Sequence, residues 1–240
     1  MKGNILSIAV IVPCRNEAGE IVPLLTAILK HIKPTDQLIV VEGGSYDPTW
    51  EIVSDFAQKN PKVLAIQQSG KGKFDAVLTG ISYAAHDYVM VWDADGTVSF
   101  QDNLRIYNFD QKKDFLITGD RLLGEREPHA MQFFNLVGNY VFAVWWGLLL
   151  KRAPLDSLCG TKKFPRDLLS ESPNWLIQKD PYGDFTMLGT AMMQGLSIES
   201  FSVDYAARRY GKTNIQRWSG GWSLLKLILL ISIRKRKNGK

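Results

Sequence analysis

The chain has 240 residues, of which 45% are hydrophobic and 22% are charged, so it can bury the core of one large domain and is not a disordered chain. Its two cysteines, Cys14 and Cys159, are too few for a disulfide framework or a cysteine-rich zinc site. The net charge of +5 comes from the last seven residues, which hold five lysines and arginines and no acid, because the rest of the chain carries 24 basic and 24 acidic residues. A nucleic-acid binder needs basic side chains spread over a face or a groove, so we expect no nucleic-acid partner.

The first half of the chain alternates apolar runs that predict strands with segments that predict helices. Strands are expected at 5–12, 37–41, 63–67 and 88–92, and helices at 21–31 and 74–85. A third helix is expected to have Asp47 as its N-cap and Pro48 as its first residue. The run at 5–12 is followed by polar residues without a small-residue cleavage site, so we interpret it as a strand and not as a signal peptide. The alternation predicts an α/β fold with a parallel sheet and helices on both faces.

Polar or glycine-rich segments come directly after the predicted strands. Their sequences are PCRNEAG, EGGSYDPT, QSGKGK and DADGT. In open α/β sheets, ligands bind at the carboxyl ends of the strands, so four such segments in register indicate a ligand site.

Asp93 and Asp95 stand one residue apart at the end of the fourth predicted strand. Two carboxylates there can coordinate Mg²⁺ or Mn²⁺, which share their ligands with substrate phosphates; the alternative is a solvated turn. The loop at 70–73 can offer N–H groups and a helix N-terminus to phosphate, or it is an exposed lysine turn. The spacing GxxxxGK[ST] is missing and no GxGxxG follows the first strand, so neither a P-loop nor a dinucleotide site is supported.

The second half is less regular. Strands are expected at 115–119 and 198–205, and helices at 129–150, 184–194 and 218–233. The segment 133–150 has 18 residues without a charge, which is the lower limit for a membrane span. A span there would put the loops of the first half and the polar residues after 150 on opposite sides of a membrane. We therefore expect a helix within the domain.

Taken together, these segments resemble the family 2 glycosyltransferases, which have the GT-A fold. The matching sequences are IVPCRNEAG, VVEGGSYDPTW, GKGKFDAVLTG, DADG, ITGDR, LDSLCGTKKF and YAARRYGKTN. The last of these is similar to the R-x-x-G-x-[ST] stretch of polyprenyl- and dolichyl-phosphate sugar transferases. The resemblance implies a GT-A domain over residues 1–217 with a mostly parallel nucleotide-binding sheet flanked by helices, followed by an amphipathic helix with a basic tail at 218–240.

The resemblance also implies a nucleotide-diphosphate sugar as donor. Five residues would lie around the nucleobase and ribose: Pro13, Arg15, Glu17, Glu42 and Ser45. Others would contact the rest of the nucleotide sugar: Lys71, Lys73, Asp75, Ala94 and Lys212. Asp93 and Asp95 would hold the divalent metal, Mn²⁺ or Mg²⁺. One departure from the family is that Glu42 is followed by Gly43, where the family often has a second acid.

Three residues are candidates for the catalytic step. The guanidinium groups of Arg121 and Arg208 present a bidentate fork to phosphate oxygens, and their alternative role is a surface salt bridge. Asp184 is the candidate base, since an acceptor hydroxyl must lose its proton, although an aspartate there can also be only a helix cap. We therefore expect an inverting, metal-dependent glycosyltransferase with a hydroxyl acceptor on a glycan or lipid-linked glycan.

Three alternatives remain open. A polyprenyl-phosphate sugar transferase would need no base, because its acceptor is already an anion. A sugar nucleotidyltransferase should have a G-x-G-x-R loop after the first strand, which PCRNEAG lacks. A membrane-recruited, non-catalytic sugar-nucleotide-binding module should have lost its acids, yet Asp93, Asp95 and Asp184 are all present.

The last predicted helix places Trp218, Trp222, Leu225 and Leu229 on one stripe ahead of the basic tail. Interfacial tryptophans and a basic end favour an anionic membrane surface as partner. The alternative is a core-packing helix with a solvated tail. We expect a cytoplasmic protein held peripherally on the inner face of the membrane.

Overall fold

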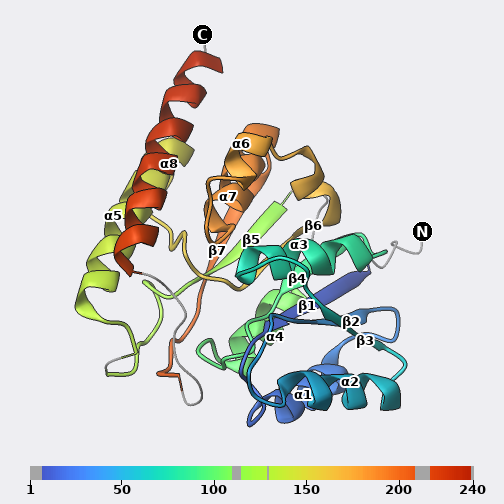
Figure 1. Cartoon of the computed structure of the whole chain (residues 1–240). Helices are drawn as coiled ribbons and strands as arrows, with labels where there is room; N and C mark the ends of the chain where they lie inside the picture. Colours follow the sequence, from blue (N-terminus) through green and yellow to red (C-terminus); the bar gives the residue numbers. More distant parts are fainter. Residues whose placement is uncertain (1–6, 110–114, 129, 209–216, 239–240) are drawn as a thin grey trace.

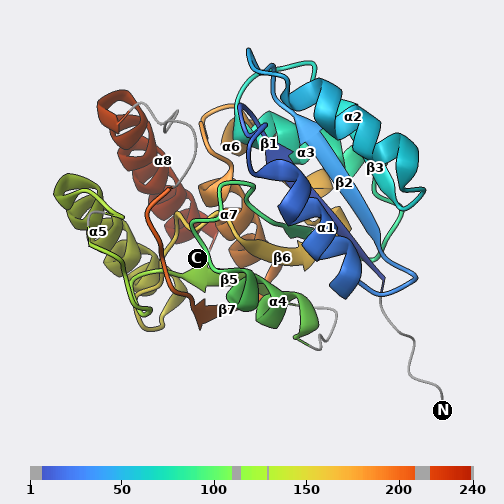
Figure 2. The same cartoon turned by 90° about the horizontal axis from the view of Figure 1, so that it is seen from below.

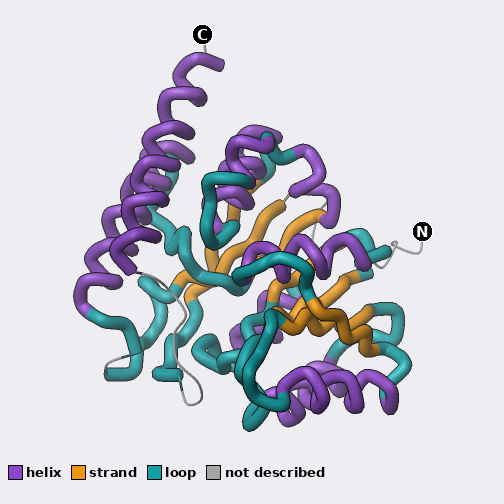
Figure 3. Tube along the Cα trace, viewed as in Figure 1, coloured by secondary structure: helices purple, strands orange, loops and turns teal. Residues whose placement is uncertain are grey.

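The computed structural model describes residues 7–109, 115–128, 130–208 and 217–238. Its centre is a seven-stranded sheet in the order β3-β2-β1-β4-β6-β5-β7, with helices on both faces (Figures 1 and 3). The strands are β1 (Ile8–Cys14), β2 (Gln37–Glu42), β3 (Val63–Gln67), β4 (Tyr88–Val91), β5 (Phe115–Asp120), β6 (Lys162–Pro165) and β7 (Ser197–Ser202). The helices are α1 (Ile21–His31), α2 (Thr49–Lys59), α3 (Lys73–Tyr83), α4 (Phe100–Asn108), α5 (Phe133–Leu150), α6 (Asn174–Ile177), α7 (Asp184–Gln194) and α8 (Arg217–Asn238), with a 3₁₀ turn η1 at Arg166–Glu171.

The parallel sheet predicted for the first half is confirmed. β1 pairs in parallel with β2 on one side and with β4 on the other, and β2 pairs in parallel with β3. Successive residues of β1 point to opposite faces, so Ala9 and Ile11 join one core cluster while Val10 and Val12 join the other. Both faces of these strands are buried, which is why their sequences are continuous apolar runs.

One boundary in this half differs from the prediction. Helix α2 begins at Thr49 and Pro48 is its N-cap, so the predicted N-cap, Asp47, lies one residue too early. The Asp47 carboxylate still accepts hydrogen bonds from the Thr49 N–H and hydroxyl, and it therefore fixes the start of the helix from outside it.

The second half contains elements that the hydrophobic pattern did not predict. Strand β6 is antiparallel to both β4 and β5 and joins the two parts of the sheet. Its sequence KKFP does not have the apolar pattern of a buried strand, yet Lys162 and Lys163 are both buried. The Lys163 ammonium donates to the carbonyls of Tyr107 and Phe109, which satisfies its charge. Helix α4 was also missed, although Ser99 caps it by accepting from the Asp102 N–H.

Helices α5 and α8 lie side by side and run in the same direction at the edge of the molecule beyond β7 (Figures 1 and 2). The Trp145 Nε1 group donates to the Ser232 hydroxyl at 3.1 Å, and the Lys235 ammonium donates to the Leu149 carbonyl. Helix α5 is, in the described part of the chain, the one helix long and apolar enough to cross a membrane, and 28% of that window is buried in the fold.

Helix α8 packs one face into the core and continues beyond the predicted end at residue 233. Its buried residues are Leu224, Leu227, Ile228 and Ile231. At its far end, Arg234 lies over the Trp175 ring with 4.0 Å to the ring centroid. Helix α8 thus packs against the core along its inner face. The first residues of the basic tail, Arg234 and Lys235, contact the body of the protein.

Candidate active site

The loops after β1 and β2 are tied together by short polar contacts at the carboxyl edge of the sheet. The Ser45 hydroxyl accepts from the Asn16 N–H at 2.8 Å, and the Glu42 carboxylate accepts from the Ser45 N–H at 2.5 Å. Pro13 is half-buried at the end of β1, and the Arg15 side chain is exposed. Glu42 and Ser45 therefore shape this loop pair, whatever else they contact.

Glu17 is a buried acid at the same edge, only 3% exposed. Its Oε1 accepts from Arg208 Nη1 at 3.4 Å, whereas its Oε2 has no hydrogen-bond partner among the described residues. Burial raises the pKa of Glu17 to about 7; the charge of Arg208 acts against this shift and that of Asp95 adds to it. The group is therefore poised to change its protonation near neutral pH.

The two acids after β4 are each paired with a cation. The Lys73 ammonium, from the start of α3, pairs with Asp93. Arg208 Nη2 lies 2.6 Å from the Asp95 Oδ2, and Thr97 donates its N–H and hydroxyl to the Asp95 Oδ1 at 3.1 and 2.8 Å. Burial favours the protonated form of Asp95, but Arg208 and Thr97 outweigh it and lower the pKa. Asp95 is therefore held as a carboxylate.

A glycine allows the Lys73–Asp93 pair to form. Any side chain at Gly160 would collide with both the Lys73 ammonium and the Asp93 carboxylate. Gly160 lies in the loop before β6, so the second half of the chain lies directly against this pair. Ala94, between the two acids, is buried.

Asp184 is the first residue of α7 and follows Gly183, which has a φ of +85° and lies against the Phe74 ring. Its Oδ1 accepts from the Lys162 ammonium at 2.5 Å. Lys162 is 0% exposed and also donates to the Cys159 carbonyl. A fully buried lysine requires such partners, so Lys162 and Asp184 fix each other's positions.

Lys73 connects the acids after β4 with Asp184. Burial lowers the pKa of Lys73, but the charges of Asp93 and Asp184 reverse this effect and raise it. The structure thus brings together Asp93 and Asp95 after β4, Lys73 of α3, Asp184 of α7 and Arg208 after β7. It follows that a diphosphate at this edge would meet two cations.

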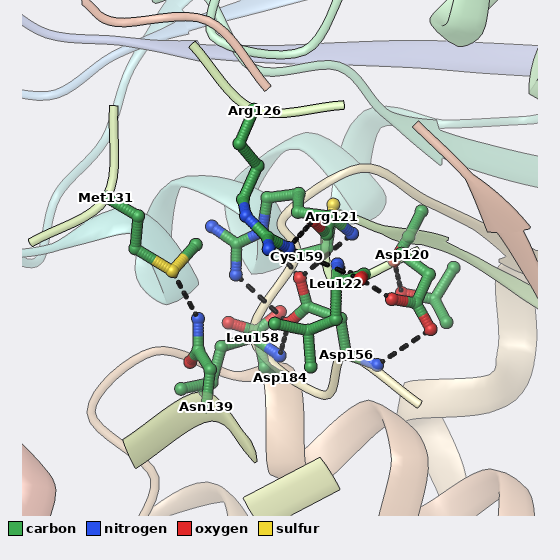
Figure 4. Close-up of polar contacts among 12 residues, drawn as sticks. Asp120, Arg121, Leu122, Arg126, Met131, Asn139, Asp156, Leu158, Cys159 and Asp184 are labelled. Atoms are coloured by element: carbon green, nitrogen blue, oxygen red, sulfur yellow. Dashed lines mark hydrogen bonds and ion pairs between the residues drawn. The ribbon is translucent and has the colours of Figure 1, made fainter. Parts of the chain in front are cut away.

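Arg121 occupies a different environment from Arg208, and Figure 4 shows its polar contacts. Its Nε and Nη2 groups bind the two Asp156 carboxylate oxygens at 2.6 and 3.0 Å. Asp156 is fully buried, and it also receives the Leu158 N–H. The Arg121 guanidinium lies 5.0 Å from the centroid of the Tyr205 ring. The pair is buried rather than a surface salt bridge, and Arg121 could bind a phosphate only while sharing its fork with Asp156.

Of the three remaining predicted site residues, Lys71 and Asp75 lie in the described part of the chain. Lys71 is exposed, and the Asp75 carboxylate accepts from the Gly70 N–H at 3.0 Å, which closes the turn before α3. Lys212 lies outside the described residues. The sequence reading missed Lys162 and Asp156 as site components, although both stand in the matching segment LDSLCGTKKF.

The donor set at the end of β4 fits a hard divalent cation bound together with a phosphate ligand. Asp93 and Asp95 supply carboxylate oxygens, which Mn²⁺ and Mg²⁺ prefer. Within the described residues, no group of three or more histidine, cysteine, aspartate or glutamate side chains could hold a metal ion.

In a comparison with known protein families, the model described as glycosyl transferase family 2 matches residues 9–142 of this chain. Among curated proteins, a dolichyl-phosphate beta-glucosyltransferase of Dictyostelium discoideum is 27% identical over 178 residues, covering 67% of this chain and 54% of that protein. A low-salt glycan biosynthesis hexosyltransferase of Haloferax volcanii is 24% identical over 229 residues, covering 93% of this chain and 53% of that protein. The chain thus spans about half the length of these relatives.

Solved structures confirm the fold. Glucosyl-3-phosphoglycerate synthase of Mycobacterium tuberculosis in complex with UDP superposes with a TM-score of 0.66 at 16% identity, covering 95% of this chain and 80% of that one. The same enzyme in complex with Mn²⁺, UDP-glucose and glycerol 3-phosphate superposes with a TM-score of 0.64 at 16% identity, covering 96% of this chain and 80% of that one. Mannosyl-3-phosphoglycerate synthase of Rubrobacter xylanophilus superposes with a TM-score of 0.66 at 15% identity, covering 98% of this chain and 75% of that one. The predicted GT-A fold is therefore correct.

Proposed function

Because the chain belongs to glycosyl transferase family 2, we propose that it transfers a sugar from a nucleotide-diphosphate sugar to an acceptor, with a divalent metal and with inversion at the anomeric carbon. One observation carries this proposal. Asp93 and Asp95, each paired with a cation, lie at the same sheet edge as a third acid, Asp184, whose charge acts on Lys73. The M. tuberculosis enzyme crystallised with Mn²⁺ and UDP-glucose supports this type of donor.

Asp93 and Asp95 would hold the Mn²⁺ or Mg²⁺ ion, which when bound would neutralise charge on the departing diphosphate. Lys73 and Arg208 already lie on these carboxylates and would bind phosphate oxygens at the same place. Arg121, held by Asp156, would act on the site by supporting the loop that precedes β6 rather than by binding phosphate alone. The partly buried loop contacts of Glu42 and Ser45 would shape the nucleoside side of the site.

Asp184 would accept the proton of an acceptor hydroxyl. Its position at the start of a buried helix is fixed by Lys162, so the carboxylate is oriented before substrate binds. A single displacement, with base and leaving group on opposite faces of the sugar, inverts the configuration. We therefore propose a hydroxyl of a glycan or lipid-linked glycan as acceptor.

The second candidate function is sugar transfer to a polyprenyl phosphate. The dolichyl-phosphate beta-glucosyltransferase similarity favours it. An anionic phosphate needs no base, so the two functions differ in their demand for Asp184. A non-catalytic sugar-nucleotide-binding module is disfavoured, because the acids needed for transfer are present.

The proposal is tested first by donor binding. UDP-, GDP- and dTDP-sugars are screened with Mn²⁺ for a rise in the Tm, because a ligand that binds the folded state stabilises it. We expect one nucleotide class to raise the Tm of the natural protein and to lose this effect in Asp93→Ala and Asp95→Ala. A shift that persists in both variants would contradict the metal and donor assignment.

Transfer is tested with the donor found in this way. Asp184→Asn should abolish transfer to hydroxyl acceptors while donor binding remains. Unchanged transfer in this variant would instead indicate a phosphate acceptor. Full turnover in excess chelator would contradict the metal requirement.

A further inference from the structure

Helix α5 exposes a long apolar stripe. Large apolar side chains recur every three or four residues on its outer face, each more than 40% exposed: Phe134, Val137, Tyr140, Val141, Val144 and Leu148. A shallow groove on this face is lined entirely by residues of α5. The opposite face of the helix packs into the core through Phe142 and Trp146. The helix is thus apolar on both faces, and the fold accounts for only one of them.

Helix α8 continues the exposed apolar surface. Trp222, Leu229 and Ile233 are 62%, 44% and 52% exposed, and they follow one another at helical spacing on the outer face. Lys226 is exposed within the same stripe. Since α5 and α8 lie side by side and parallel, their outer residues form one surface, here called the α5–α8 face (Figures 1 and 2). Contiguous apolar surface of this kind is uncommon on monomeric soluble proteins and marks an interaction site.

The charge around this face has one sign. In the described stretches 130–155 and 220–235, which contain most of the two helices, the charged side chains are all basic, with no aspartate or glutamate: Lys151, Arg152, Lys226, Arg234 and Lys235. Cationic side chains meet at the C-terminal ends of the two helices. Burial and then the nearby charge of Lys151 lower the pKa of Lys235, so these two ammonium groups are neighbours. A cationic, acid-free setting suits an anionic partner surface.

The inner side of α8, opposite the α5–α8 face, lies against the region of the candidate active site. Gly220, at the start of α8, lies directly against the Tyr182 hydroxyl, two residues before Asp184. Helix α8 thus lies between the partner of this face and the region of the candidate active site.

We propose that the α5–α8 face binds flat on the surface of a membrane that contains anionic phospholipids. The apolar stripe enters the region between head groups and acyl chains, and the lysines and arginines lie among the phosphates. Helix α5 does not cross the membrane, because its inner face and that of α8 belong to the protein core. Compared with the sequence-based expectation, the surface includes α5, and the first two basic residues of the tail, Arg234 and Lys235, contact Trp175 and Leu149 of the protein body. This binding needs neither donor nor acceptor, so it is independent of the proposed function.

The test is flotation of the full chain with vesicles of phosphatidylcholine, alone or mixed with phosphatidylglycerol. Val144→Asp and Trp222→Asp place a carboxylate on each helix of the face. Tyr83→Asp is the matched control, since Tyr83 is a similarly exposed large side chain, 55% exposed, on α3. We expect the natural protein and the control to bind the mixed vesicles, with weaker binding at high salt. Each variant of the face should bind about tenfold less tightly or worse.

Two further measurements make the outcome decisive. An unchanged Tm of each variant excludes unfolding as the cause of lost binding. Asp93→Ala should bind vesicles normally, which separates this inference from the sugar-transfer proposal. Binding that survives both face variants would overturn the inference. So would analytical ultracentrifugation showing a dimer that Val144→Asp dissociates, because the face would then be an interface between two copies of the chain.

Discussion

The parallel half of the sheet and the mixed half hold their polar groups in different ways. In the first half, side chains at the carboxyl edge of the sheet accept hydrogen bonds from loop backbone, as Ser45 does from Asn16 and Asp75 does from Gly70. In the second half, the polar groups are held by buried ion pairs, as in Arg121–Asp156 and Lys162–Asp184.

This difference has an energetic consequence. A loop hydrogen bond contributes about 1 kcal/mol, whereas removing one partner of a buried ion pair leaves an uncompensated charge and costs roughly 3–5 kcal/mol. The first half can therefore adjust its loops to a ligand, while the second half provides a fixed frame. The following predictions test this contrast in order of expected effect.

The largest effect is expected at the Arg121–Asp156 pair. Arg121→Met leaves the fully buried Asp156 carboxylate unpaired, and the free energy of unfolding should fall by about 3–5 kcal/mol in urea titrations. Adding Asp156→Asn should recover part of this loss, because the amide carbonyl still accepts the Leu158 N–H. Lys59→Met, which removes an exposed ion pair with Asp55, is the control and should change nothing measurable. Equal effects at the two sites would abolish the contrast.

The next effect is expected where the two halves meet. Gly160→Ala places a methyl group against the Lys73–Asp93 pair and should reduce donor affinity at least about tenfold, with roughly 1–3 kcal/mol lost in stability. Gly138→Ala is the matched control, since nothing lies within 4 Å of the added atom. Isothermal titration with the donor nucleotide measures both variants. Unaltered affinity in Gly160→Ala would mean that the pair tolerates displacement.

A pH-dependent effect is expected at Glu17. Its pKa is raised to about 7 in the folded protein from an ordinary value near 4.5, so the folded state binds the proton more readily than the unfolded state. Stability should therefore fall as the pH rises from about 4.5 to 7, and the loss is complete above that window. Glu17→Gln should match the natural protein at low pH and exceed it at pH 8 by about 1–3 kcal/mol. If the difference in the free energy of unfolding between the two proteins stays constant across this pH range, the burial of Glu17 is not a source of instability.

The smallest effect is expected in the loop pair of the first half. Ser45→Ala removes the acceptor of the Asn16 N–H and should cost about 1 kcal/mol of stability, measured by urea titration. Ser45→Thr keeps the hydroxyl and should retain most of it. A loss as large as that of Arg121→Met would show that this loop is part of the rigid frame.

The same contrast explains what the sequence could predict. The first four strands were predicted within a few residues, because runs such as Val89–Met90 are buried on both sheet faces and carry a simple apolar pattern. Asp93 and Asp95 stood out because they follow such a run directly. Strand β6 could not be found in the same way, since Lys162 and Lys163 are charged residues whose burial depends on partners elsewhere in the fold.

The pairing of the site residues was equally beyond the sequence. Arg121 and Arg208 both follow a strand of the second half, yet Arg121 binds Asp156 whereas Arg208 binds Asp95 and Glu17. Which acid meets which arginine is decided by the packing of β5, β6 and β7. Family resemblance supplied the candidates, and only tertiary structure distinguished their environments.

Strand β6 also bears on how the protein is made. It is only four residues long, yet it is the element that pairs with both β4 and β5. Until residue 165 has left the ribosome, β5 has no partner through which to join the first four strands, although those strands can already pair with one another. Domains synthesised N-terminal first can fold such a segment early. The nascent chain should therefore acquire its parallel half first, and the acids after β4 should meet Lys162 and Asp184 only in the final stage of assembly.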